Sequence, residues 1–218
     1  MTRLFVITCT LLIALTTLLP VSARENAFDL GRNLYSTNYI FLDADTGQVL
    51  DAKKQDEQIS IASLTKMMTV LLAIENSSSL NENITITDEM LAGLYEEQAS
   101  VAGYISGDVA TLLDLCYAAA VPSGADAANA LALQIGGSFE KFYQMMNDKA
   151  AELGMNHTVF KSAHGLDRDG QYSTVEDMSK LLRYALQNPT FKEIFSTKEY
   201  TTQATTYYPF GIPLASTI

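Results

Sequence analysis

The sequence predicts a mixed fold that contains both helices and strands. A long apolar segment, residues 61–74, has no clean polar face, which is typical of a helix buried inside a domain. Two β-type segments, residues 38–43 and 48–52, flank a turn at 44–47 that ends in glycine, so we expect them to pair. Residues 138–153 form a strongly amphipathic helical pattern. Segments of both kinds in one chain indicate the α/β (α+β) class.

The charge and composition of the chain exclude several classes of function. The 218 residues carry a net charge of −11, and the charged side chains are dispersed along the chain. Such a chain is repelled by phosphate backbones and anionic surfaces, so we expect no nucleic-acid partner. The only two histidines, His157 and His164, have no cluster of metal-ligand residues beside them in the sequence. We therefore expect no metal site.

The first 23 residues have the pattern of a signal peptide. One positive side chain precedes the almost entirely apolar residues 4–19, and small residues lead to a cleavage site after Ala23. The apolar run is short for a membrane-spanning helix, which favours cleavage over an uncleaved signal anchor. We expect residues 24–218 to form one exported domain, located in the periplasm or cell-wall space.

The cysteines do not indicate a disulfide scaffold. Cys9 would leave with the signal peptide, and Cys116 would remain as the only thiol, so an internal bridge is not possible. Cys116 lies in an apolar run and is interpreted as a small core residue.

Lys66 is an anomaly within the predicted buried helix, because burying an unpaired ammonium is costly. Ser63 lies three residues earlier, on the same face and near the helix start, where free backbone N–H groups favour a developing negative charge. A hydroxyl beside a lysine that burial can turn into a base makes an activated nucleophile. Ser63 and Lys66 are therefore candidate catalytic residues.

A simpler interpretation stays open at this point: Ser63 is a helix N-cap, and Lys66 reaches the surface from the edge of the helix. Ser-x-x-Lys is a weak pattern, and Ser138 to Lys141 matches it as well. That second match follows two glycines and opens the amphipathic helix, so Ser138 is most simply a cap.

The remaining elements are short and have recognisable ends. We expect a strand at 84–87, a short helix opening at 87–89, helices at 109–115 and 174–187, a loop at 160–167, and extended hairpin structure at 191–208. Thr174 is the expected N-cap of its helix, and Gly154 the left-handed end of helix 138–153.

A second serine stands at a break between two helices. Pro122, Ser123 and Gly124 interrupt a helical run, and an alanine-rich helix with Asp126 in its first turn follows. From this pattern alone, Ser123 is as readily a cap in a helix–helix connection as a functional residue.

Three motifs occur in the order Ser63-Leu64-Thr65-Lys66, then Pro122-Ser123-Gly124 with Asp126, then His164-Gly165-Leu166-Asp167 with Ser173-Thr174 and Asp177. Together they resemble the serine D-Ala-D-Ala carboxypeptidases, the low-molecular-mass penicillin-binding proteins related to class A β-lactamases. The resemblance extends over nearly the whole mature chain, and three motifs in register are far more specific than one Ser-x-x-Lys.

The resemblance implies a β-lactamase/transpeptidase-like fold, with a central antiparallel sheet between helical layers. Ser63 would attack the carbonyl between the last two D-alanines of a bacterial peptidoglycan stem peptide. Lys66 would accept its proton, and Ser123 would relay a proton towards the leaving D-alanine. Water would then hydrolyse the acyl-enzyme without a metal or organic cofactor, and a β-lactam would acylate Ser63 in the same way.

The second motif departs from the family pattern. The family has Ser-x-Asn there, whereas the third position of this chain is Ala125, whose side chain cannot form a hydrogen bond. Asn129 lies one helical turn further on and is a candidate substitute.

The third family motif, Lys-Thr-Gly on an edge strand, does not occur in these 218 residues. The family spacing places it shortly after Ile218. We therefore expect a truncated or incomplete product of an active family, in which the C-terminal strands of the sheet are missing. An open reading frame beyond Ile218 that encodes the motif would show that the chain is a fragment. A C-terminal domain and a membrane-surface helix, present in many relatives, are not visible either, which leaves membrane association open.

These observations favour a carboxypeptidase, a hydrolase of cell-wall peptidoglycan biosynthesis and cell shape. An inactive remnant that binds peptidoglycan or penicillin is the alternative, which the missing motif favours. A class A-like β-lactamase is disfavoured, because its deacylating Glu-x-x-Leu-Asn segment does not occur between Ser123 and Ile218.

Overall fold

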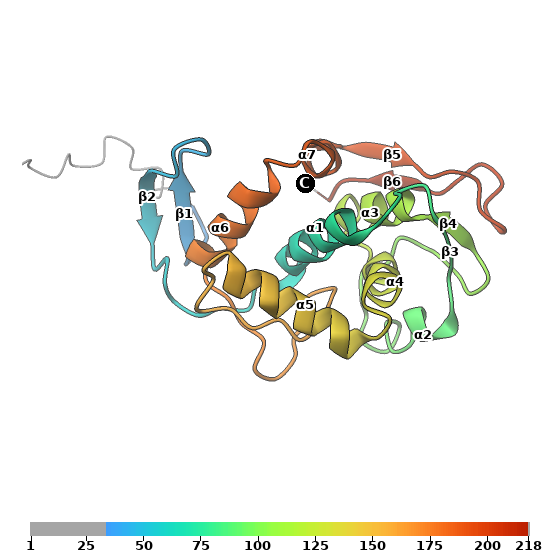
Figure 1. Ribbon diagram of the computed structural model, residues 1–218, viewed down its shortest axis with the longest axis horizontal. Helices are drawn as coiled ribbons and strands as arrows, with labels where there is room; N and C mark the ends of the chain where they lie inside the picture. Colours follow the sequence, from blue (N-terminus) through green and yellow to red (C-terminus); the bar gives the residue numbers. More distant parts are fainter. Residues whose placement is uncertain (1–33, 218) are drawn as a thin grey trace, which may run out of the picture.

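Helix α1 (Lys66–Asn76) lies at the centre of the computed structural model, which describes residues 34–217 (Figure 1). Met68, Val70, Leu71 and Ala73 in this helix are fully buried. Helices that follow α1 in the chain pack around it. A helix in this position can be apolar on every side, so the predicted buried helix is confirmed.

The first turn of the predicted helix is separate from α1. Residues Ala62–Thr65 form the 3-10 helix η2. Ala62 has a φ of 44°, in the left-handed region, so a continuous α-helix cannot begin before it. Ser63 therefore lies on a tight turn at the N-terminal end of α1 rather than inside a regular helix.

Strands β1 (Tyr39–Leu42) and β2 (Val49–Lys53) form the predicted antiparallel hairpin. Gly47 in the connecting turn has a φ of 75°. A side chain at this position would overlap Arg183 of helix α6 (Val175–Ala185). The positive φ is the reason that the turn needs glycine, because the end of the Arg183 side chain could move aside.

A second ribbon joins β3 (Asn83–Thr85) to β4 (Val109–Thr111). The prediction of a helix from residue 109 is wrong for its first three residues, which are extended. Helix α3 (Leu112–Ala120) begins only after Thr111, whose hydroxyl accepts a hydrogen bond from the Asp114 N–H at 3.0 Å. This cap fixes the start of the helix, and the residues before it are free to pair with β3.

The prediction of extended structure at 191–208 is wrong for its first part. Helix α7 (Pro189–Ser196) begins after Asn188, whose side-chain oxygen accepts hydrogen bonds from two backbone N–H groups of the first turn. Proline at the first helical position and asparagine at the cap are strong start signals. Phe191 and Ile194 are buried on the inner face of this helix.

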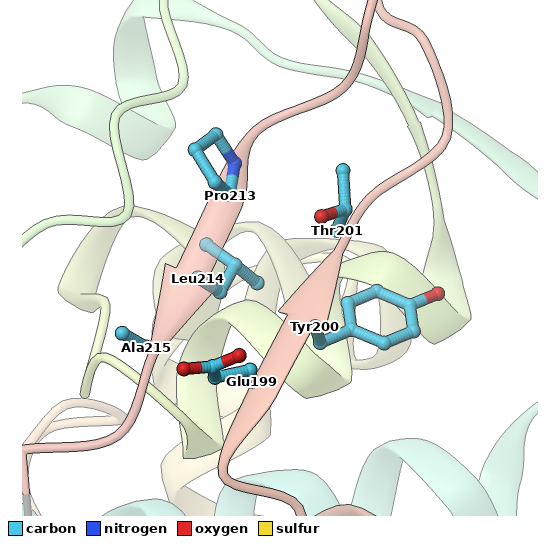
Figure 2. Close-up of a pocket in the computed structure, with 6 residues that line it drawn as sticks. All are labelled: Glu199, Tyr200, Thr201, Pro213, Leu214 and Ala215. Atoms are coloured by element: carbon cyan, nitrogen blue, oxygen red, sulfur yellow. The ribbon is translucent and has the colours of Figure 1, made fainter.

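The last ribbon pairs β5 (Glu199–Thr201) with β6 (Pro213–Ala215). These six residues, drawn in Figure 2, line a hollow of about 330 Å³. None of the predicted site residues lines this hollow, because all of its lining residues belong to β5 and β6. It is therefore a feature of the hairpin surface and not the candidate site.

Three helices complete the described fold: α2 (Asp88–Leu91), α4 (Ala125–Gly136) and α5 (Phe139–Glu152). The Ser138 hydroxyl accepts a hydrogen bond from the Lys141 N–H at 3.3 Å, which confirms that the second Ser-x-x-Lys is a cap. Gly154 after α5 has a φ of 69°, and Thr174 caps α6 through the Asp177 N–H, as predicted.

The strands of residues 34–217 form three separate two-stranded ribbons. Within the same residues, no helix has the length and apolar character needed to cross a membrane. Cys116 is buried with a free thiol, as predicted, and burial raises its pKa. The predicted signal peptide, residues 1–23, lies outside the described residues.

Candidate active site

Ser63 is exposed to solvent on η2, directly ahead of the buried helix α1. The loop around Gly165 packs against this turn. Gly165 has a φ of 88°, and a side chain there would overlap the carbonyl group of Ala62 and lie 2.9 Å from the Thr65 hydroxyl. The glycine therefore lets the loop backbone press directly on the turn that carries Ser63.

Lys66 is the first residue of α1 and only 4% exposed. Its Nζ atom lies 3.4 Å from Ser63 Oγ, 3.2 Å from Ser123 Oγ and 2.7 Å from the carbonyl oxygen of His164. The short contact is a good hydrogen bond, whereas the contact to Ser63 is long. Lys66 is thus held against the loop and reaches towards both hydroxyls.

Ser123 lies in the connection between α3 and α4, where the sequence places the helix break. Its φ is 63°, which is uncommon for a residue with a side chain. This conformation brings its Oγ within 2.9 Å of Ser63 Oγ, to which it donates a hydrogen bond. The structure thus brings all three predicted residues, Ser63, Lys66 and Ser123, into one cluster.

Burial controls the charge of the cluster. It lowers the pKa of Lys66 from its usual 10.5 to about 8, and the negative charge of Asp126 opposes this shift. With this pKa, roughly one lysine in ten is neutral at pH 7, whereas almost none would be neutral with the usual value. An appreciable fraction of Lys66 can therefore accept a proton.

The contact between Lys66 and the carbonyl oxygen of His164 could not be predicted from the sequence. His164 occurs there only as part of the third motif, and a backbone oxygen has no sequence signature. The one signal available was Gly165, because a glycine can mark an unusual backbone conformation. Burial and the charge of Lys66 lower the pKa of the His164 ring to about 4. The ring is therefore neutral, and its Nδ1 accepts a hydrogen bond from the Leu166 N–H at 3.3 Å.

Asn129 does not replace the family asparagine. Its Nδ2 donates a hydrogen bond to the carbonyl oxygen of Met90 at 3.0 Å, in the direction of α2. Ala125, at the position of the family asparagine, is buried at the start of α4, and its backbone N–H donates to Ser100 O at 2.7 Å. Asn129, the candidate substitute named from the sequence, is therefore bonded away from the cluster and does not line the cavity beside it.

A cavity of about 430 Å³ opens beside the cluster. Ser63, Lys66 and Ser123 line it on one side, and α7 contributes the apolar Ile194 and Phe195. Apolar walls with a few converging polar groups are typical of a small-molecule site. A nucleophile, a base and a second hydroxyl beside one cavity are suited to acyl transfer.

The described residues contain no group of three or more His, Cys, Asp or Glu side chains that could hold a metal ion.

Comparisons with known proteins identify the family of the chain. Residues 23–212 match the D-alanyl-D-alanine carboxypeptidase family. The chain is 34% identical over 165 residues to the D-alanyl-D-alanine carboxypeptidase DacF of Bacillus subtilis, which covers 73% of this chain and 41% of DacF. It is 33% identical over 168 residues to a D-alanyl-D-alanine carboxypeptidase of Streptomyces strain K15, covering 74% of this chain and 58% of the relative. The chain thus spans about half the length of these curated relatives.

Solved structures show the same fold. The crystal structure of the Streptomyces K15 DD-transpeptidase matches with a TM-score of 0.73 and 32% identity, covering 82% of this chain and 70% of that one. The D-alanyl-D-alanine carboxypeptidase DacD of Francisella tularensis matches with a TM-score of 0.71 and 31% identity, covering 76% and 40%. The expected β-lactamase/transpeptidase-like fold is therefore confirmed. The central antiparallel sheet expected with it is not formed within residues 34–217, whose strands pair only as three two-stranded ribbons. With a family match over most of its length, this chain belongs to the D-alanyl-D-alanine carboxypeptidase family.

Proposed function

We propose that this chain is the catalytic domain of a serine-type D-Ala-D-Ala carboxypeptidase, which removes the terminal D-alanine from peptidoglycan stem peptides through an acyl-enzyme. The observation that carries the proposal is the convergence of Ser63, Lys66 and Ser123 around one cavity, with no contact between them longer than 3.4 Å. Membership of the family supports the choice of substrate.

In the acylation step, neutral Lys66 accepts the Ser63 hydroxyl proton, and Ser63 Oγ forms a bond to the carbonyl carbon between the two D-alanines. When the tetrahedral intermediate collapses, the C–N bond breaks. The leaving amine takes a proton that passes from Lys66 through Ser123, whose Oγ lies 3.2 Å from the Lys66 Nζ. D-Alanine departs, and the remaining peptide stays on Ser63 as an ester.

In the second step, water attacks the ester and gives a proton to Lys66. The bond from the carbonyl carbon to Ser63 Oγ breaks, and Ser63 recovers its proton. A β-lactam is attacked by the same atom, and its ring-opened product stays attached to Ser63. The position of Lys66 in both steps is fixed by its hydrogen bond to the His164 carbonyl oxygen.

We place this activity outside the cytoplasmic membrane, where peptidoglycan is found. The positive start, the apolar run and the small residues before Ala23 support export. The net charge of −11 supports a partner other than nucleic acid. N-terminal sequencing of the exported protein should begin near Arg24; a mature protein that begins at Met1 would contradict this assignment.

The activity is tested by incubating the full-length gene product with a stem pentapeptide that ends in D-Ala-D-Ala and measuring released D-alanine. Release should be lost in Ser63→Ala and kept in Ser138→Ala, the matched control in the other Ser-x-x-Lys. Rapid turnover of nitrocefin without release of D-alanine would instead identify a β-lactamase. Binding of penicillin without release of D-alanine or turnover of nitrocefin would identify a binding protein without hydrolytic activity.

A further inference from the structure

The carboxylate of Asp126, which has no role in the proposed mechanism, accepts four backbone hydrogen bonds. It lies in the first turn of α4 and is 1% exposed. Its carboxylate accepts backbone N–H groups from Ala102 at 2.8 Å, Gly103 at 2.9 Å and Tyr104 at 3.1 Å, and from its own neighbour Ala127 at 2.9 Å. Three of these donors belong to the segment between α2 and β4, far from α4 in the sequence (Figure 1).

The same segment touches the Ser123–Gly124 connection directly. The carbonyl oxygen of Ser100 accepts the Ala125 N–H at 2.7 Å. A side chain added at Gly124 would lie 2.7 Å from the carbonyl oxygen of Ala118 in α3. It would also lie 2.8 Å from Asp126 Oδ1 and 3.0 Å from the Ala102 Cβ. The segment, the carboxylate and the connection are therefore packed without room for a methyl group.

Ser123 depends on this packing for its geometry. A serine in the left-handed region persists only when its surroundings fix it. Its hydroxyl lies 2.9 Å from Ser63 Oγ and 3.2 Å from Lys66 Nζ, so a small shift of the connection would separate the cluster.

We propose that Asp126 is a positioning residue of the active site: its buried carboxylate fastens residues 102–104 to the start of α4 and thereby holds Ser123 against Ser63 and Lys66. This inference rests on the proposed function for its catalytic consequence, whereas the coupling between segment 102–104 and the Ser123 connection is a property of the fold.

The carboxylate also acts on Lys66 through its charge. Lys66 faces the hydroxyls of Ser63 and Ser123, the carbonyl and neutral ring of His164, and the negative charge of Asp126. Glu97 and Arg168 form an ion pair with each other at 2.8 Å and act on His164. Removal of the Asp126 charge should therefore lower the pKa of Lys66 below about 8.

The test compares Asp126→Asn with Asp108→Asn. Asp108 is a matched control, because it is also fully buried and accepts hydrogen bonds from Ile105, Thr205 and Tyr207, at the other end of the same segment. It does not act on the charge of Lys66. Amide hydrogen exchange and NMR titration of ¹³C-labelled lysine, with Lys66→Arg for assignment, are measured on the full-length protein.

In Asp126→Asn we expect faster exchange both at residues 102–104 and at Gly124 and Ala125, together with a Lys66 titration midpoint below that of the unmodified protein. Asp108→Asn should leave the Lys66 midpoint unchanged. Faster exchange at 102–104 alone would overturn the positioning role, and an unchanged Lys66 midpoint would overturn the charge effect.

Acylation by a fluorescent penicillin at pH 9, where most Lys66 is neutral in both proteins, reports the position of Ser123 separately from the charge. We expect a rate at least about tenfold lower in Asp126→Asn, because the proton relay is misplaced. A rate equal to that of the unmodified protein would overturn the catalytic consequence.

Gly124→Ala serves as a second variant if Asp126→Asn does not fold. It keeps the negative charge, but the new methyl group forces the connection away from the Ala118 carbonyl, the carboxylate and Ala102. Acylation should therefore fall while the Lys66 midpoint stays near 8; unchanged acylation in the folded variant would contradict the proposal. The exchange and titration results do not depend on turnover. A protein that shows both effects but releases no D-alanine would contradict the proposed function and leave the role of Asp126 in the fold intact.

Discussion

The Lys66 Nζ atom lies 2.7 Å from the carbonyl oxygen of His164, closer than it lies to either serine hydroxyl. A carbonyl oxygen can accept a hydrogen bond from the neutral amine as well as from the ammonium. The contact therefore holds Lys66 in place in both protonation states. It also leaves the nitrogen lone pair of the neutral form available to the hydroxyls.

Replacement of Lys66 by arginine separates the positive charge from the base. Arginine keeps a cation at this position but does not lose its proton in proteins. We expect Lys66→Arg to fold and to lose acylation by penicillin by about 10² or more, as for removal of a general base. Acylation and circular dichroism are measured on the same preparation. Near-normal acylation in the folded variant would show that the charge alone suffices.

The pKa of Lys66 predicts a dependence of activity on pH. Because the neutral amine is the base, acylation should increase as the pH rises through about 8. The rate of penicillin acylation, measured from pH 6 to pH 10 for the unmodified protein, checks this. A rate that falls over the same interval would indicate that the charged form of Lys66 is the active one.

The same shift predicts a dependence of stability on pH. The pKa of Lys66 is lower in the folded state than its usual 10.5, so the unfolded state binds more protons between pH 8 and pH 10.5. Below pH 8 the buried charge of Lys66 lowers the free energy of unfolding by its full amount. As the pH rises from 8 to 10.5 this penalty disappears, and the free energy of unfolding increases by at most about 3 kcal/mol. Urea unfolding measures this increase, which should be present in the unmodified protein and absent in Lys66→Met. Equal gains in the two proteins would contradict the shift.

Gly165 provides a test of the loop that holds the cluster. Gly165→Ala should destabilise the protein by more than 2 kcal/mol and lower acylation, because the new methyl group would overlap the Ala62 carbonyl beside Ser63. Gly170→Ala is the matched control, since Gly170 also has a positive φ but faces only the flexible end of Lys161. Thermal unfolding and acylation are measured for both. An equal effect of the two changes would mean that the loss of stability comes from backbone strain and not from the contact with Ala62.

Local sequence patterns correctly predicted the turns and helix ends that are fixed by residues only a few positions away in the chain. The turn at Gly47 and the caps Ser138 and Thr174 are examples, because each satisfies its backbone within a few residues. Helix α7 was missed although Asn188 and Pro189 signal its start, since the polar residues after it outweighed the buried Phe191 and Ile194. The helix break at Ser123 was visible in the sequence, but its left-handed conformation was not.

Local sequence patterns could not predict contacts between residues that are far apart in the sequence. A cation in an apolar helix needs a partner, which makes Lys66 conspicuous in the sequence, and the structure gives its Nζ three hydrogen-bond partners. Its nearest partner is a backbone oxygen 98 residues away, which any residue type could have supplied. The bonds from Asp126 to residues 102–104 are of the same kind, since the sequence showed only an acid in a first helical turn.

The proposed mechanism depends on Ser63 being the nucleophile, and covalent labelling identifies the nucleophile. The full-length gene product is incubated with a fluorescent penicillin, digested, and analysed by mass spectrometry. The label should lie on the peptide that contains Ser63 and disappear in Ser63→Ala. It should persist in Ser138→Ala, which removes only a helix cap worth about 1 kcal/mol. Labelling that survives in folded Ser63→Ala, or that maps to Ser123, would show that Ser63 is not the nucleophile.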